Sequence, residues 1–165
     1  MHTTATASRT SAPTSLPPVG VVAAVYEAFG RGDVPGVLAL CADDVVFDDD
    51  SLPSATQSAG HPLFSTHRGK TEVREFFAAL ATYDFGRFEV LDLMVSSGAS
   101  PDPASEKELV HVAARVLIAL TPPAGNTVED DEMHLWGIGA DGLVHTMRHY
   151  ADTAKHIAAM AGASS

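Results

Sequence analysis

Three consecutive aspartates, Asp48 to Asp50, end a short apolar segment that begins at residue 44. In an extended strand Phe47 and Asp49 point to the same face, because side chains alternate with a period of two. If that face lines an apolar pocket, burial raises the pKa of the Asp49 carboxylate. Such a carboxylate can take a proton from a carbon next to a carbonyl group at neutral pH. Alternatively, the three aspartates form a solvated strand end.

A histidine in a later segment is the second candidate. His134 shares one face of the predicted strand 127–138 with Glu132 and Trp136. A neutral imidazole in a pocket can donate a hydrogen bond to a developing enolate oxygen or shuttle a proton. The alternative is a core histidine that is satisfied by a backbone carbonyl.

The last predicted strand, residues 143–150, offers a third candidate whose orientation depends on register. In one register Met147 and His149 face the pocket, while Arg148 and Tyr150 face away. A shift of one residue exchanges the two sets. The sequence leaves both registers open.

The eight histidines also raise the question of a metal site. His145 and His149 are four residues apart, but on a strand this spacing separates them by about 13 Å. The sequence has no HExxH motif, and Cys41 is its single cysteine, so no cysteine pair exists. Because the familiar ligand patterns are missing, we predict neither a metal nor a cofactor.

Composition limits the partners. The formal net charge is −11, and nucleic acids and anionic membranes both require a basic face. No apolar run approaches the roughly 20 residues that span a bilayer. Residues 1–18 are rich in Thr, Ser, Ala and Pro and lack the apolar centre of a signal peptide. We therefore expect a disordered tail over 1–18, a C-terminal tail over 161–165 and a cytoplasmic location.

Hydrophobic periodicity predicts the elements between these tails. An apolar stripe from residue 19 to the glycines at 30 and 32 indicates a helix, and Asp33 can cap a second helix that ends near Ala42. A strand is expected at 44–49, a long loop at 50–68 and a third helix from Gly69 to Leu80. The remaining chain predicts strands at 88–95, 107–120, 127–138 and 143–150, followed by a helix at 152–160. This order indicates an α+β fold with an antiparallel sheet.

The same order resembles the cone-shaped α+β barrel of the nuclear transport factor-like superfamily, which includes ketosteroid isomerases and SnoaL-like polyketide cyclases. The residues that carry the resemblance are Gly32-Asp33, the ADD of 42–44, GKTEVREFF at 69–77 and DGLVHTMRHY at 141–150. The resemblance covers 19–158. It implies one domain at 19–160, in which a curved antiparallel sheet wraps around three N-terminal helices and encloses an apolar pocket.

The ketosteroid isomerases imply roles for single positions. Asp49 stands where their general base lies, and His134 stands where a protonated aspartate donates to the substrate oxygen. Val25 and Phe77 stand at two tyrosine positions, so both phenols are replaced. With Asp49 and His134 as catalytic residues, the predicted substrate-binding residues are Val25, Phe29, Phe47, Phe77, Trp136, Met147 and His149.

These positions suggest cofactor-free proton transfer, of the isomerase or cyclase type, on a small apolar carbonyl-containing molecule. One alternative is a binding module without chemistry, which the loss of both phenols favours. Another is epoxide hydrolysis by Asp49, Arg115 and Glu132, provided that their faces converge.

The long strand 107–120 has two different faces. Val110, Val112, Val116 and Ile118 form an apolar set on one of them. His111 and Arg115 lie on the other, either at a convex surface or on a polar pocket wall. If the apolar set is convex, it predicts a homodimer through the outer face of the sheet.

Overall fold

Six strands form one sheet in the order β2-β1-β6-β5-β4-β3 in the computed structural model, which describes residues 15–161. Neighbouring strands are antiparallel, except that β1 runs parallel to β6. Their bounds are Cys41–Phe47 for β1, His67–Arg68 for β2, Asp84–Pro101 for β3, Glu108–Thr121 for β4, Val128–Ile138 for β5 and Val144–Tyr150 for β6.

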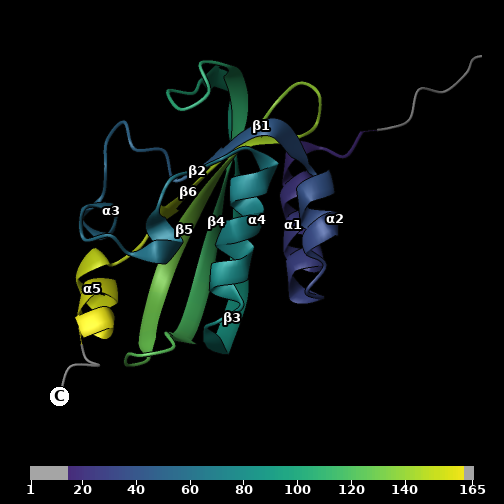
Figure 1. Ribbon diagram of the computed structural model, residues 1–165. Helices are drawn as coiled ribbons and strands as arrows, with labels where there is room; N and C mark the ends of the chain where they lie inside the picture. The colour runs from purple at the N-terminus through teal and green to yellow at the C-terminus, as the bar shows by residue number, and fades with distance from the viewer. Residues whose placement is uncertain (1–14, 162–165) are drawn as a thin grey trace, which may run out of the picture.

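The major helices cover one face of this sheet (Figure 1). Helix α1 (Pro18–Gly30) contacts β3, β4 and β5, and α2 (Val34–Ala39) packs against α1. Helix α4 (Gly69–Leu80) packs on β1, and α5 (Thr153–Ala161) contacts β5. The α+β fold with a curved sheet around N-terminal helices is therefore confirmed.

The first helix forms as its apolar pattern predicts. Its buried side chains are Val21, Val22, Val25 and Ala28, which recur on one helical face. Pro18 occupies the first helical position, where its missing N–H costs little. The helix ends at Gly30, and Asp33 then caps α2 by accepting a hydrogen bond of 2.9 Å from the N–H of Gly36.

Several element boundaries differ from the prediction. Strand β1 begins at Cys41 and ends at Phe47 rather than spanning 44–49, and β3 is much longer than 88–95. The predicted loop 50–68 contains α3 (Ala55–Ser58), the 3-10 helix η1 (Pro62–Phe64) and β2. Ser54 and Gln57 form a capping box at the start of α3. The helix is too short to show an apolar period, so hydrophobic periodicity did not predict it.

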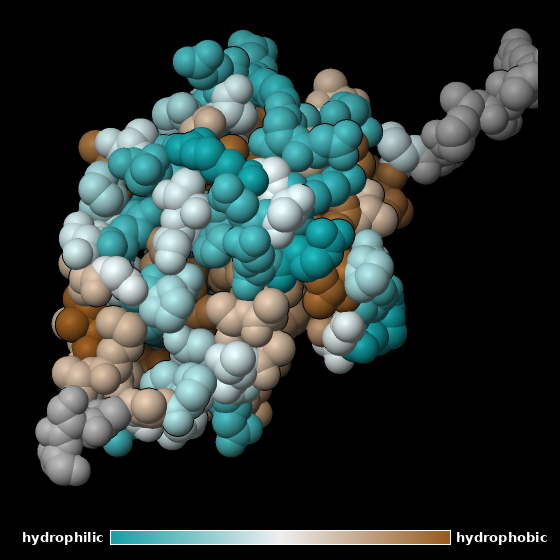
Figure 2. Space-filling view, in the orientation of Figure 1, coloured by the Kyte–Doolittle hydropathy of each residue, from teal (hydrophilic) through white to brown (hydrophobic). Residues whose placement is uncertain are grey.

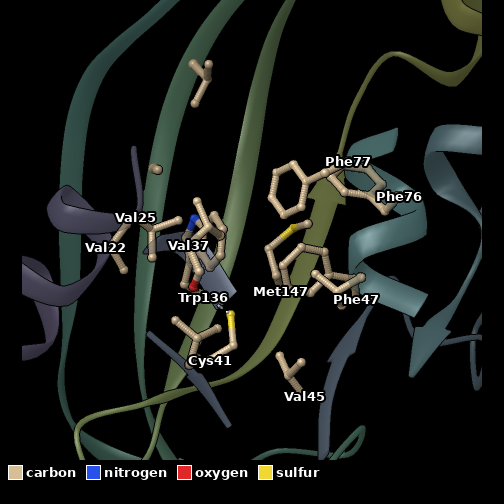
Figure 3. Close-up of a cluster of buried hydrophobic side chains, with 14 of the residues drawn as sticks. Val22, Val25, Val37, Cys41, Val45, Phe47, Phe76, Phe77, Trp136 and Met147 are labelled. Carbon is tan, nitrogen blue, oxygen red and sulfur yellow. Dashed lines mark hydrogen bonds between the residues drawn. The ribbon is translucent and has the colours of Figure 1, made fainter. Parts of the chain in front are cut away.

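The apolar set of β4 faces inward, so the predicted dimer interface through this set is wrong. Val112, Val116 and Ile118 are buried in the core between the sheet and the helices, and Val110 is half-buried. A one-sided sheet buries its continuous apolar face under the helices. Figure 3 shows part of this core, with Val22 and Val25 of α1 on one side and Phe76 and Phe77 of α4 on the other.

Hydrophilic residues cover the upper part of the face seen in Figure 2. Within residues 15–161, no helix is long and apolar enough to cross a membrane. Residues 1–14 and 162–165, which make up most of the two predicted tails, lie outside the described residues.

Candidate active site

A cavity of about 70 Å³ lies between the inner face of the sheet, α1, α4 and η1. Phenylalanines form much of its wall, and a group of acidic and histidine side chains enters it from β5, β6 and α5. The lining residues are Val25, Tyr26, Phe29, Phe47, Leu63, Phe64, Phe76, Phe77, Leu80, Phe85, Phe88, Ile118, Leu120, Glu132, His134, Trp136, Met147, His149 and His156.

Most of the predicted site residues meet at this cavity. His134 and His149 line it, and so do the predicted substrate-binding residues Val25, Phe29, Phe47, Phe77, Trp136 and Met147. Figure 3 shows Trp136, Met147 and Phe47 between α1 and α4. The register of β6 thus places Met147 and His149 inside, while Tyr150 is exposed on the other side.

Asp49 does not line the cavity. Its carboxylate lies 3.2 Å from the guanidinium of Arg68 and accepts a hydrogen bond from the N–H of Ser51. Burial acts to raise the pKa of Asp49, but these two partners outweigh it and the pKa is lowered. The structure therefore contradicts the expected apolar environment and raised pKa, which a pocket base at this position requires.

The backbone at Asp48 explains this difference. Strand β1 ends at Phe47, and Asp48 adopts a φ of 51°, in the left-handed region that aspartate tolerates better than most residues. The simple alternation of faces stops there. Side chains of Gln57 and Thr66 both donate hydrogen bonds of 2.7 Å to the carbonyl of Asp48 and hold this turn.

Asp48, rather than Asp49, bonds to a residue that lines the cavity, although its own side chain does not line it. One carboxylate oxygen of Asp48 accepts from the backbone N–H of His149 at 2.9 Å, and the other lies 2.7 Å from its Nδ1. Burial acts to lower the pKa of His149, but the charge and hydrogen bond of Asp48 outweigh it and the pKa is raised. With the Nδ1 proton held by Asp48, the neutral imidazole carries its lone pair on Nε2.

A second chain of hydrogen bonds crosses the cavity wall from α1 to β5. The indole N–H of Trp136 donates to the hydroxyl oxygen of Tyr26 at 3.0 Å. The hydroxyl of Tyr26 lies 2.8 Å from Nδ1 of His134, whose Nε2 lies 3.1 Å from Glu132. An ionised Glu132 can only accept, so Nε2 of His134 carries a proton and donates it to Glu132. In the neutral ring Nδ1 then has no proton and accepts the hydrogen bond from the Tyr26 hydroxyl. This assigns His134 as the Nε2–H tautomer.

The charge states in this chain follow from burial and neighbours. Burial is the largest influence on His134 and lowers its pKa, although Glu132 opposes this. Burial acts to raise the pKa of Glu132, but the nearby His134 and His156 outweigh it and hold that pKa far below its usual range. Burial also raises the pKa of Tyr26. Neutral His134, ionised Glu132 and protonated Tyr26 are therefore the states at neutral pH.

The two chains meet at their histidines. The ring centroids of His134 and His149 lie 4.7 Å apart, with an interplanar angle of 80°. A proton acceptor on His149 and a phenol donor on Tyr26 therefore line the same apolar cavity. This combination can remove a proton from carbon and stabilise the negative charge that develops on a carbonyl oxygen.

The sequence interpretation missed three polar residues of this site, Tyr26, Asp48 and His156, and named Glu132 only for the epoxide-hydrolase alternative. It described the first helix only as an apolar stripe and assigned the tyrosine position to Val25, the residue before Tyr26. Glu132 was recognisable from its shared face with His134 and Trp136. The contribution of Asp48 depends on a backbone turn, and that of His156 on the docking of α5, neither of which strand periodicity predicts.

The geometry decides two alternatives that the sequence left open. Arg115 is exposed and bonded to Asp131 on the outer face, so Asp49, Arg115 and Glu132 do not converge on a water molecule. His111 is not on the pocket wall, because it does not line the cavity and bonds instead to Asp102 at 3.0 Å. The epoxide-hydrolase arrangement is therefore absent from the described residues.

Comparisons with known proteins agree with this architecture. The SnoaL-like domain family matches residues 22–147, and the chain belongs to this family. A Delta 5-3-ketosteroid isomerase from Mycobacterium sp. is 22% identical to this protein and superposes with a TM-score of 0.60. The match covers 85% of this chain and 97% of the isomerase.

Two further solved structures extend the comparison. An NTF2-like protein of unknown function from Burkholderia pseudomallei is 24% identical, with coverages of 87% and 96% and a TM-score of 0.61. A Mycobacterium tuberculosis protein in complex with estradiol-17beta-hemisuccinate is 25% identical, with coverages of 79% and 89% and a TM-score of 0.51. No curated protein matches the sequence.

Proposed function

We propose that this protein catalyses proton transfer, of the isomerase or cyclase type, on a small and largely apolar ketone. The cavity binds the molecule through its aromatic wall. His149 takes a proton from the carbon next to the carbonyl group and returns it to another carbon, so no external oxidant or reductant is needed. Asp48 orients the imidazole and stabilises the imidazolium that forms.

The hydrogen bonding of His149 carries this proposal. Its Nδ1 is held 2.7 Å from a carboxylate, whereas no described residue bonds to its Nε2. A half-buried imidazole that lines the cavity, and whose basic nitrogen has no partner among residues 15–161, is available to a ligand there. We therefore place the base at His149 rather than at Asp49, whose carboxylate is bonded to Arg68.

Tyr26 is the proposed donor to the enolate oxygen. Its hydroxyl proton, now directed at Nδ1 of His134, can turn to a carbonyl oxygen that enters the cavity. The N–H of Trp136 remains on the phenol oxygen and supports negative charge there. His134, predicted from the sequence as the direct donor, would then position Tyr26, because both of its ring nitrogens are already bonded.

The second candidate function is binding without chemistry. A computationally designed 17-OHP binder shares this fold at 25% identity and a TM-score of 0.55, and the M. tuberculosis relative holds a steroid derivative. The mostly aromatic wall of the cavity favours an apolar ligand under either function.

One experiment separates the two candidates. Apolar cyclic ketones, including β,γ-unsaturated steroid ketones, are incubated with the protein in D₂O, and deuterium incorporation next to the carbonyl is followed by NMR. We expect exchange with the wild type, and a loss of about 10²-fold or more in His149→Gln with binding retained. Binding without exchange in the wild type supports a binding module. If no ketone binds, the proton-transfer proposal is refuted.

We also propose a homodimer through the outer face of the sheet, although not through the residues first expected. The outward side chains of β3, β5 and β6 include Met94 and Tyr150, which are 44% and 53% exposed, and the half-buried Met133 and Leu135. Apolar side chains at the centre of an exposed sheet face are typical of an interface.

A further inference from the structure

Three ionisable side chains form a compact buried group at the β5 end of the cavity. Asp130 and Glu132 are two residues apart on β5 and so point to the same side, and His156 reaches them from α5. Their exposed fractions are 8%, 4% and 1%. One ligand atom from each residue lies within 4.8 Å of the other two.

The polar atoms at the centre of this group lack partners. Among residues 15–161, neither ring nitrogen of His156 has a hydrogen-bond partner, and neither does Oε1 of Glu132. The Nε2 of His156 and the Oε1 of Glu132 are nevertheless only 2.9 Å apart. Their distance suits a hydrogen bond but their angles do not. Both atoms are therefore buried without a hydrogen bond, and this costs free energy of folding.

Two ligand atoms of one metal ion also lie close together without a hydrogen bond between them. Ligand atoms at about 2.1 Å from a cation lie about 3.0 Å apart at right angles and about 3.4 Å apart at the tetrahedral angle. Each of them points at the ion rather than at its neighbour. Nε2 of His156 and Oε1 of Glu132 fit this spacing, and Oδ2 of Asp130 lies 3.4 Å from the same Nε2.

The surroundings hold two of the three ligands in orientation. Nε2–H of His134 donates to the other oxygen of Glu132, and the N–H of Asp152 donates to Asp130 at 2.7 Å. Hydrogen bonds of this kind fix the carboxylates of metal sites. Two carboxylates and an imidazole that is neutral, as a metal ligand must be, carry a charge of about −2. The ammonium of Lys155, 3.3 Å from Oδ1 of Asp130, offsets only part of it, and a divalent ion would supply the rest.

We propose that Asp130, Glu132 and His156 bind a divalent transition-metal ion such as Zn²⁺. Glu132 and His156 both line the cavity, so the ion faces it with coordination positions left for water or a ligand oxygen. This inference does not depend on the proposed base, because His149 and Asp48 are not among the ligands, but it shares Glu132 with the chain that positions Tyr26. The sequence interpretation did not reach it, because one ligand comes from a separate helix and no short motif links the three.

The test uses the full chain, stripped with EDTA and dialysed, with Zn²⁺ and Co²⁺ alone as probes. We expect one Zn²⁺ per chain by calorimetry, a rise in Tm with Zn²⁺, and visible absorption bands on addition of Co²⁺. His156→Gln should weaken Zn²⁺ binding by about 10²-fold or more, because it removes the nitrogen ligand. Asp130→Asn is the second variant, since its amide oxygen can still accept the N–H of Asp152.

The matched control is His61→Gln. The His61 ring centroid lies 5.7 Å from that of His156, but its Nδ1 accepts from the N–H of Leu63 and the residue is not one of the three ligands. We expect this variant to bind Zn²⁺ as the wild type does. The proposal is overturned if the stripped wild type takes up no Zn²⁺, or if binding is equally tight in the folded His156→Gln and Asp130→Asn variants. In either case the group is a buried ion pair only.

Discussion

Replacing Asp48 with asparagine tests the His149 assignment most directly, because it changes the proton on the imidazole and little else. One oxygen of Asp48 accepts the backbone N–H of His149 at 2.9 Å. In Asp48→Asn the amide oxygen must keep this position, so the amide NH₂ faces Nδ1 of His149. An NH₂ group donates, which forces Nδ1 to accept and moves the ring proton to Nε2. The base at the cavity is then lost.

The expected magnitudes follow from the same contact. Loss of a positioned general base costs about 10²–10⁴ in rate, and we expect kcat/KM for ketone exchange to fall within that range. An opposite charge within about 4–6 Å shifts a pKa by about 1–3 units, so the pKa of His149 should fall by at least about one unit. The fold should persist, because asparagine also tolerates the φ of 51° at this position.

Two assays report on this variant, and Asp49→Asn is the matched control. Long-range ¹⁵N–¹H NMR identifies the tautomer of His149, and a pH titration of its ring protons gives the pKa. The exchange assay in D₂O gives the rate. Because Asp49 bonds to Arg68 and does not line the cavity, Asp49→Asn should leave the exchange rate within about twofold. An unchanged rate in Asp48→Asn together with a large loss in Asp49→Asn would refute our reasoning and restore the base to Asp49.

Three further outcomes are expected. Tyr26→Phe should lower the exchange rate by about 10²-fold and, in urea unfolding, the free energy of unfolding by about 1–3 kcal/mol. The reason is that it leaves His134 and Trp136 without their shared hydrogen-bond partner. A variant as stable and active as the wild type contradicts this prediction. Burial, with His156 nearby, lowers the pKa of His61 from 6.5 to about 4, so the neutral ring contributes stability above pH 6.5 that is lost as the pH falls towards 4. His61→Gln should reduce this loss by about 1–2 kcal/mol, and an identical pH profile in urea unfolding argues against it. Light scattering of the wild type should give twice the chain mass of 17.2 kDa, and Leu135→Lys on the outer sheet face should give the single mass; a monomeric wild type at micromolar concentration rejects the dimer.

The sequence predicted the fold well because the fold depends on repeating patterns. The helical stripe of α1 and the alternating faces of β4 and β5 persist over many residues, and each repeat supports the same interpretation. Trp136 and His134 reached the cavity as predicted for this reason. Short elements were predicted less well. The capping box at Ser54 spans only four residues, and the sequence interpretation assigned the helix that follows it to a loop.

The candidate site was harder to predict because single residues break those patterns. At the left-handed backbone of Asp48 the alternation of faces stops, and Asp48 rather than Asp49 bonds to His149. On α1, the sequence interpretation assigned a tyrosine position to Val25, whereas the phenol that lines the cavity belongs to the next residue, Tyr26. The sequence alone also gave no sign of which face of β4 is convex, since that depends on where the helices pack.

The grouping of acids and histidines at one end of an apolar cavity supports a functional role over a structural one. Buried ionisable groups are costly, and replacing such a group with apolar residues often leaves a protein equally or more stable. This chain nevertheless buries Asp48, Glu132, His134 and His156, together with the half-buried His149, beside a wall of phenylalanines. Each carboxylate contacts at least one imidazole. Among the described residues, however, Nε2 of His149 and both ring nitrogens of His156 have no hydrogen-bond partner. A purely structural network would satisfy these nitrogens. Their availability is therefore the strongest physical reason to expect a ligand, a proton transfer or an ion at this end of the cavity.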